Sequence, residues 1–98
     1  MINRSDQIYF KLCSDHLSLE AIPKTRIRVN FTKIKENPPQ DYVLVMWTPH
    51  FAVVRNQSGQ EITLRGDGRM VVRKAKSEIA AREAAAEMMS LVLKDFEL

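Results

Sequence analysis

The chain has 98 residues, of which 45% are hydrophobic and 28% are charged, as is ordinary for one soluble globular domain. No apolar run approaches the ~20 residues of a membrane span, and no signal-peptide pattern stands at Met1, so we expect an intracellular, cytoplasmic protein without membrane contact. The net charge is +3, but residues 24–36 and 55–76 are strongly basic, whereas residues 77–98 are acidic. The basic charge therefore gathers in the predicted strands.

The N-terminal part, residues 1–23, predicts a helical segment. Apolar side chains within residues 6–19 recur at helical spacing, and Ser5 or Asp6 can cap the helix. Pro23 closes this region.

Residues 24–76 predict an antiparallel sheet. Its strand patterns cover residues 25–32, 42–47, 51–56, 61–65 and 69–74. The first alternates strictly, with Ile27, Val29 and Phe31 on one side, which is typical of a half-buried strand. The second is almost wholly apolar and predicts a strand buried on both faces. Between the last two, Gly66-Asp67-Gly68 suits a tight hairpin.

Residues 77–95 predict a long C-terminal helix. Ser77 is a good N-cap, and alanine and methionine side chains form its apolar stripe. The order is α-β-β-β-β-β-α in one domain, residues 1–98. We therefore expect an α+β fold in which a five-stranded antiparallel sheet carries helices on one face.

Alternation along the strands predicts which side chains the open face presents. The face that meets the helices receives Ala52, Val54, Ile62, Leu64, Met70 and Val72. The open face receives Glu61 and Thr63 together with the seven residues predicted to bind nucleic acid, Phe51, Val53, Arg55, Arg65, Arg69, Val71 and Arg73, with Arg26, Arg28 and Lys74 as an extension. Arginines mixed with apolar groups suit contact with phosphates and bases, although an ordinary solvated sheet face is the plainer interpretation.

Several short motifs in residues 42–93 resemble one repeat of the TATA-binding protein fold. They are Phe51-Ala52-Val53-Val54, Ser58-Gly59-Gln60-Glu61-Ile62-Thr63-Leu64, Gly68-Arg69-Met70-Val71-Val72, Ala75-Lys76-Ser77-Glu78 and Arg82. The resemblance implies a sheet face that presses into the DNA minor groove, with Phe51 at a wedge position and Val71 at a groove-contacting valine.

The chain departs from that family at several positions. Arg65 stands where a second wedge phenylalanine belongs, Arg73 where a threonine belongs, and Lys74 where a glycine precedes Ala75. Residues 33–41 leave no room for the helix usually found between the first two strands. Only one repeat is present, so a symmetric saddle would need a homodimer.

A double-stranded-RNA-binding domain is a second resemblance. Its first helix would be residues 24–36, followed by a proline-rich lead into Tyr42 and a basic, alanine-rich last helix. This arrangement puts residues 70–72 in an exposed loop, and we rank it second.

Other chemistry has little support in the sequence. Cys13, His16 and His50 are too few for a structural zinc site, and Cys13 alone cannot form an internal disulfide. We expect no catalytic residue, metal, cofactor or small-molecule substrate. The predicted function is non-catalytic binding of DNA or RNA, as a monomer or homodimer; the alternative is a protein-interaction module that docks a partner through the open face or the last helix.

Overall fold

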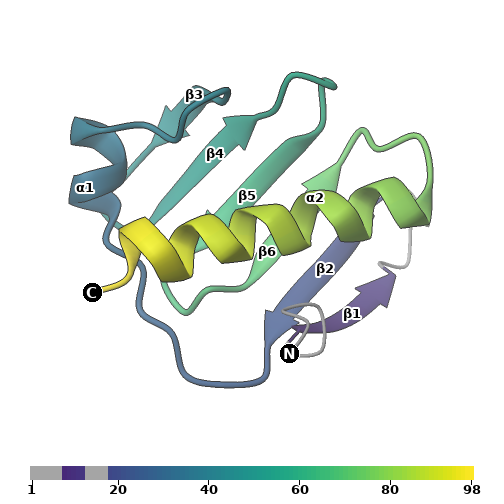
Figure 1. Cartoon of the computed structure of the whole chain (residues 1–98), viewed down its shortest axis with the longest axis horizontal. Helices are drawn as coiled ribbons and strands as arrows, with labels where there is room; N and C mark the ends of the chain where they lie inside the picture. Colours follow the sequence, from purple (N-terminus) through teal and green to yellow (C-terminus); the bar gives the residue numbers. More distant parts are fainter. Residues whose placement is uncertain (1–7, 13–17) are drawn as a thin grey trace.

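The computed structural model describes residues 8–12 and 18–98, in which one antiparallel sheet carries helices on one side (Figure 1). The strands are β1 Ile8–Leu12, β2 Ser18–Pro23, β3 Val43–Trp47, β4 Phe51–Arg55, β5 Glu61–Arg65 and β6 Met70–Arg73. Their order across the sheet is β1-β2-β6-β5-β4-β3, and every pair of neighbours is antiparallel. The expected α+β class is confirmed, but the described sheet has six strands instead of five.

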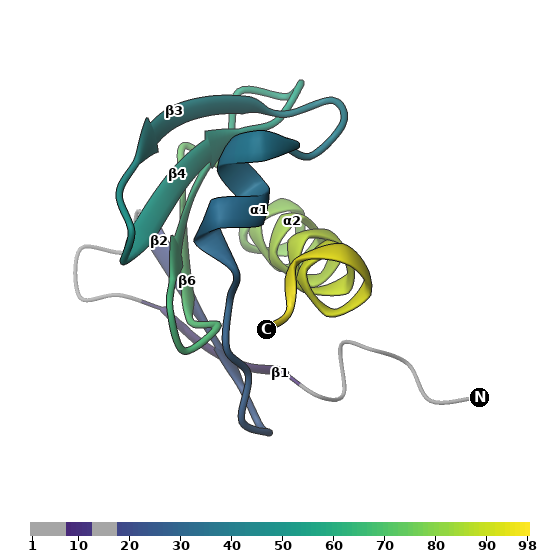
Figure 2. The ribbon, with the colours of Figure 1, turned by 90° about the vertical axis from the view of Figure 1, so that its left-hand side faces the viewer.

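Both helical regions lie on the same side of the sheet (Figure 2). They are α1 Phe31–Glu36 and α2 Glu78–Leu91, and α2 continues into a π-helical turn, η2 Val92–Phe96. Ser77 caps α2 as predicted, because its hydroxyl accepts a hydrogen bond from the Ala80 amide at 3.1 Å. No helix in the described ranges is long and apolar enough to cross a membrane.

The prediction of an N-terminal helix is wrong for the residues that the structure describes. β1 and β2 pair as a hairpin, and Ile8, Leu19 and Ala21 are buried on the side that faces α2. Ile8, Phe10 and Leu12 fit a period of two, whereas Ile8, Tyr9 and Leu12 fit a helical spacing, so a segment this short does not distinguish the two. The proposed caps Ser5 and Asp6 lie outside the described residues.

The strand predicted at residues 25–32 is also wrong. These residues form an extended connection with one isolated bridge, Val29 to Glu97, and then enter α1. The expected burial of Ile27, Val29 and Phe31 is nevertheless correct. An alternating pattern indicates which side of a segment is buried, but it does not show whether the backbone of that segment pairs with a strand. The Asn30 side chain accepts from the Lys33 amide and caps α1, a helix that the sequence did not predict before β3.

β3 is an edge strand, not one buried on both faces. Val43, Val45 and Met46 are 59%, 43% and 52% exposed, and the register shifts between Leu44 and Met46. Trp47 instead packs toward the helices, where its indole N–H donates to the Phe31 carbonyl at 2.7 Å. The apolar run correctly predicts a strand, but it carries no information about the place of that strand in the sheet.

β4, β5 and β6 agree with the sequence prediction in position and in face. Ala52, Val54, Ile62, Leu64, Met70 and Val72 are all buried. They pack with the buried alanines and methionines of α2 in one hydrophobic core. The opposite side of these strands is consequently the open face.

Candidate nucleic-acid interface

The strand register arranges the open face in three rows that cross the sheet. The central row is Lys11, Glu20, Val71, Thr63, Val53 and Met46. On one side lies the Arg73 row, which is Ser18, Arg73, Glu61, Arg55 and Val43. On the other lies the Arg65 row, which is Arg69, Arg65 and Phe51. All seven residues predicted for the site therefore lie on one face.

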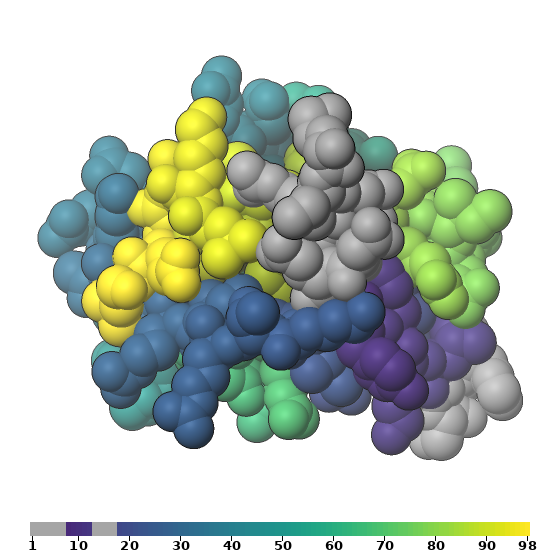
Figure 3. Space-filling view, turned by 60° about the horizontal axis from the view of Figure 1, so that its bottom comes forward, coloured from purple at the N-terminus to yellow at the C-terminus, as the bar shows by residue number. Residues whose placement is uncertain are grey.

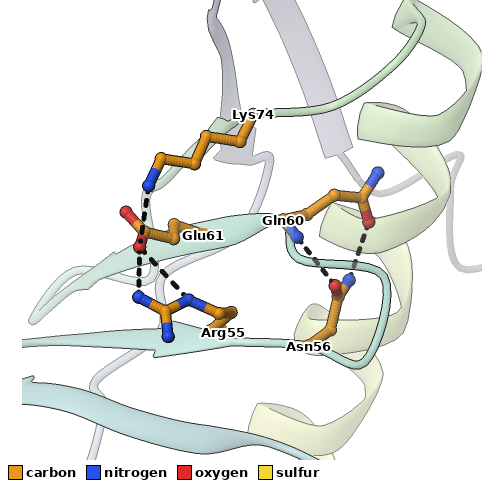
Figure 4. Close-up of polar contacts among 5 residues, drawn as sticks. All are labelled: Arg55, Asn56, Gln60, Glu61 and Lys74. Atoms are coloured by element: carbon orange, nitrogen blue, oxygen red, sulfur yellow. Dashed lines mark hydrogen bonds and ion pairs between the residues drawn. The ribbon is translucent and has the colours of Figure 1, made fainter.

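The Arg73 row contains an ion cluster centred on Glu61 (Figure 4). One carboxylate oxygen, Oε2, lies 2.8 Å from Arg55 Nη2 and 3.3 Å from Lys74 Nζ. Hydrogen bonds from Arg55 and then Lys74 hold the pKa of the Glu61 carboxyl below its ordinary value. Arg55 and Lys74 are thus already engaged with an acid of the protein.

The turn beside this cluster is closed by Asn56. Its side-chain amide donates to Gln60 Oε1 at 2.7 Å, and its side-chain oxygen accepts from the Gln60 amide at 3.0 Å (Figure 4). These bonds fix the β4–β5 turn, and with it the register that places Arg55 opposite Glu61.

Arg69 is also held by acids. Its Nε lies 3.4 Å from Asp67 Oδ2, and its Nη1 lies 4.0 Å from Glu20 Oε1. Arg65 and Arg73, in contrast, make no ion pair with any described residue. The four predicted phosphate-binding arginines therefore differ, because Arg65 and Arg73 carry charge that no described carboxylate offsets directly.

Apolar and hydroxyl groups occupy the middle of the face. Val71, Thr63 and Val53 are half-buried neighbours on β6, β5 and β4. Phe51 is half-buried at the start of β4, in a hollow that is also lined by Thr63 and Arg65. The Thr48 hydroxyl accepts from the Phe51 amide at 3.0 Å and fixes the turn before it. The backbone that carries the Phe51 ring is therefore held in place by this hydrogen bond.

The sequence did not identify five residues of these rows: Lys11, Ser18, Glu20, Val43 and Met46. The first three were missed because their segment was predicted as helical, and the other two because β3 was expected to be buried. The sequence does indicate the pairing of Arg55 with Glu61, because a turn at residues 57–60 places these two residues opposite each other on adjacent strands. His50, which the sequence suggests only as a metal ligand, also lines the hollow at Phe51.

The described residues give little support to a functional site of another kind. Within residues 8–12 and 18–98, no three His, Cys, Asp or Glu side chains are grouped so that they could hold a metal ion. The proposed ligands Cys13 and His16 lie outside these ranges. Burial and then a hydrogen bond to Glu87 raise the pKa of the Tyr42 phenol, but this group contacts α2, on the side opposite the open face.

Comparison of the chain with protein-family models, with curated proteins and with solved structures gave no match. The fold and the electrostatics of the open face are therefore the basis for a functional proposal.

Proposed function

We propose that this protein binds nucleic acid, without catalysis, through its open sheet face. One observation carries the proposal: the central row of Val71, Thr63 and Val53 is flanked by Arg65 in one row and Arg73 in the other, and neither arginine pairs with a described acid. The two flanking rows are four residues apart along a strand, or about 13 Å. Phosphates would meet the arginines while sugars or bases contact the strip between them.

Two features support the resemblance to a TATA-binding protein repeat. α1 lies between β2 and β3, so the expectation that residues 33–41 leave no room for the helix that this family has between two strands is wrong. Lys74, which occupies the place of a family glycine, has φ of 63°, a conformation that favours glycine. Arg65 and Arg73 replace a wedge phenylalanine and a threonine, so we propose a surface that seeks phosphate more than it reads sequence.

The double-stranded-RNA-binding arrangement has less support. It needs a loop at residues 70–72, but these lie in β6, which pairs with β2 and with β5. It also needs a helix over residues 24–36, of which α1 covers Phe31–Glu36.

The test is the double charge reversal Arg65→Glu with Arg73→Glu. We expect the logarithm of the duplex-binding constant to lose roughly 1.8 units of slope against the logarithm of salt concentration, about 0.9 for each phosphate that the variant no longer neutralises. A matched control, Lys33→Glu with Lys94→Glu, makes the same change of net charge at exposed residues of α1 and η2. Equal losses in both variants, or a flat salt response of the unmodified protein, would reject the open face as the site.

A protein-interaction surface is the second candidate, and β3 favours it. Val43, Val45 and Met46 are exposed on an edge strand that contains no charged residue. Such an edge is suited to pairing with another chain, including a second copy of this one. Val45→Lys would abolish self-association in sedimentation experiments if this edge forms a homodimer. Retention of nucleic acid unchanged by Arg65→Glu with Arg73→Glu would favour this candidate over the first.

A further inference from the structure

Two adjoining hollows meet at the end of the sheet where β5 turns into β6. One opens on the sheet face and is lined by Phe51, Thr63 and Arg65; the other is lined by Arg26 and Arg28 of the connection between β2 and α1. Both hollows are also lined by His50, Gly66 and Asp67. We call the two hollows together the end groove, because they share these three lining residues.

The far wall of the end groove has a fixed backbone. The Val29 amide donates to the Gly66 carbonyl at 3.1 Å, and the Leu98 amide donates to the Arg28 carbonyl at 2.8 Å. Ile27 is buried between Arg26 and Arg28, which are both exposed. Figure 3 shows this connection, in blue, crossing one end of the molecule beside the yellow C-terminal segment. The two arginines are therefore anchored by the core on which their neighbours pack.

The charges along the end groove favour a polyanion. Arg26, Arg28 and Arg65 form no ion pair with any residue in the described part of the chain. Asp67 is the acidic side chain in the lining, and it is engaged with Arg69 through both its carboxylate oxygens. Cations thus stand at both ends of the groove, and the Phe51 ring lies at the end that opens on the sheet face.

We infer that the end groove binds single-stranded nucleic acid, which enters from the open face and passes around the end of the sheet to Arg26 and Arg28. This inference rests on the proposed function and narrows its ligand. A base would stack on Phe51, and the flanking phosphates would meet Arg65 on one side and the two connection arginines on the other.

The path of the groove selects against a duplex. The whole molecule measures 32 × 30 × 23 Å, so a ligand that follows both hollows must turn sharply within a few nucleotides. Double-stranded DNA stays nearly straight over such a length, because its persistence length is about 150 base pairs. A single strand rotates freely about its backbone bonds and makes the turn at little cost.

The test compares a single strand of about 12 nucleotides, within the site size of one small binding domain, with the duplex of the same sequence. In the variant Arg26→Gln with Arg28→Gln, we expect the salt slope for the single strand to fall by roughly 1.4, about 0.7 for each phosphate left without its arginine. Duplex binding should stay unchanged. The matched control is Lys33→Gln with Lys94→Gln, which removes the same charge from exposed residues outside the groove.

A second variant blocks the groove without a change of charge. A Cβ added at Gly66 would lie 3.8 Å from Phe31 Cε2 and 3.9 Å from the His50 carbonyl oxygen, which are ordinary contacts. Gly66→Met should therefore fold, place its longer side chain in the junction of the two hollows, and weaken single-strand binding at every salt concentration. Thermal unfolding of each variant verifies the fold.

The outcomes separate the two proposals. If the unmodified protein binds neither probe, the proposed function fails. If it binds but the Arg26→Gln, Arg28→Gln variant keeps the single-strand salt slope, or loses duplex binding equally, the end groove is not the path of a single strand. Chemical-shift mapping of the unmodified protein gives an independent reading, because the amides of residues 26–28 and 66 must shift with the single strand.

Discussion

Arg55 and Glu61 are cross-strand partners on β4 and β5, and 2.8 Å separates the Arg55 Nη2 atom from the Glu61 Oε2 atom. The same oxygen holds Lys74 at 3.3 Å. One carboxylate thus engages two cations in the row that also contains Arg73. A polyanion that docks on this row must compete with Glu61 for both of them.

Glu61→Gln should therefore strengthen nucleic-acid binding. The change removes one negative charge from the open face and releases Arg55 and Lys74 for phosphates. We expect the salt slope to become steeper by roughly 0.9 for each cation that gains a phosphate on duplex DNA. The control is Glu83→Gln, which removes the same charge from an exposed position on α2. Weaker binding by the Glu61 variant would mean that this row does not contact the ligand.

Glu61 should also make stability dependent on pH. Its pKa in the folded protein lies below the ordinary value of 4.5, because Arg55 and Lys74 donate to the carboxylate. The ionised form is therefore favoured by folding, and its contribution is present above pH 4.5 and lost as the pH falls through the lowered pKa. The difference in the free energy of unfolding between the unmodified protein and Glu61→Gln, followed by denaturant titration, should shrink on acidification. A difference that is constant with pH would contradict the assigned ion cluster.

Phe51 provides a test of stacking that is separate from charge. Phe51→Ala should weaken binding by about 1–3 kcal/mol if one base stacks on the ring, and the salt slope should not change because no cation is removed. Phe51→Leu keeps most of the apolar volume and serves as a control for packing, since this ring is half-buried. Binding constants at several salt concentrations give both quantities. Equal affinities of all three proteins would exclude a stacked base at this position.

The left-handed backbone conformation of Lys74, with φ of 63°, should affect the free energy of unfolding. Lys74→Gly and Lys74→Ala both remove the ion pair with Glu61, but only glycine adopts this φ without a steric penalty. We expect the glycine variant to be the more stable by about 1 kcal/mol in chemical denaturation. If Lys74 had ordinary strand geometry, the alanine variant would be the more stable of the two.

Tyr42 and Glu87 join the start of β3 to α2. The phenol hydroxyl donates to Glu87 Oε1 at 2.8 Å. Tyr42→Phe should lower the free energy of unfolding by about 1 kcal/mol, and combining it with Glu87→Gln should give less than the sum of the two single effects. Additive effects would show that the two groups do not interact in solution. Nucleic-acid binding should be unaffected, because this pair lies on the helix side of the sheet.

The parts of the fold that the sequence predicted correctly are those with local signals. Gly68, at φ of 86°, marks the turn before β6, and Ser77 marks the start of α2. β1 and β2 were missed because so short an apolar pattern does not distinguish a strand from a helix, and the edge position of β3 was missed because it depends on which distant segments pair. Glu20 is an example: it approaches Arg69 only because β2 lies beside β6, and no spacing along the chain indicates that neighbour.

Gly68 lies in the turn before β6 and close to Ile27, which stands between Arg26 and Arg28 in the sequence. A Cβ at this position would lie 3.1 Å from Ile27 Cβ and 3.2 Å from Pro23 Cγ, on a backbone that already disfavours side chains. Any larger residue would therefore push Ile27, and with it the segment that carries Arg26 and Arg28, out of its present position. A replacement at Gly68, which is not itself a lining residue of the end groove, would thus act twice, by destabilising the fold and by displacing two arginines of the groove.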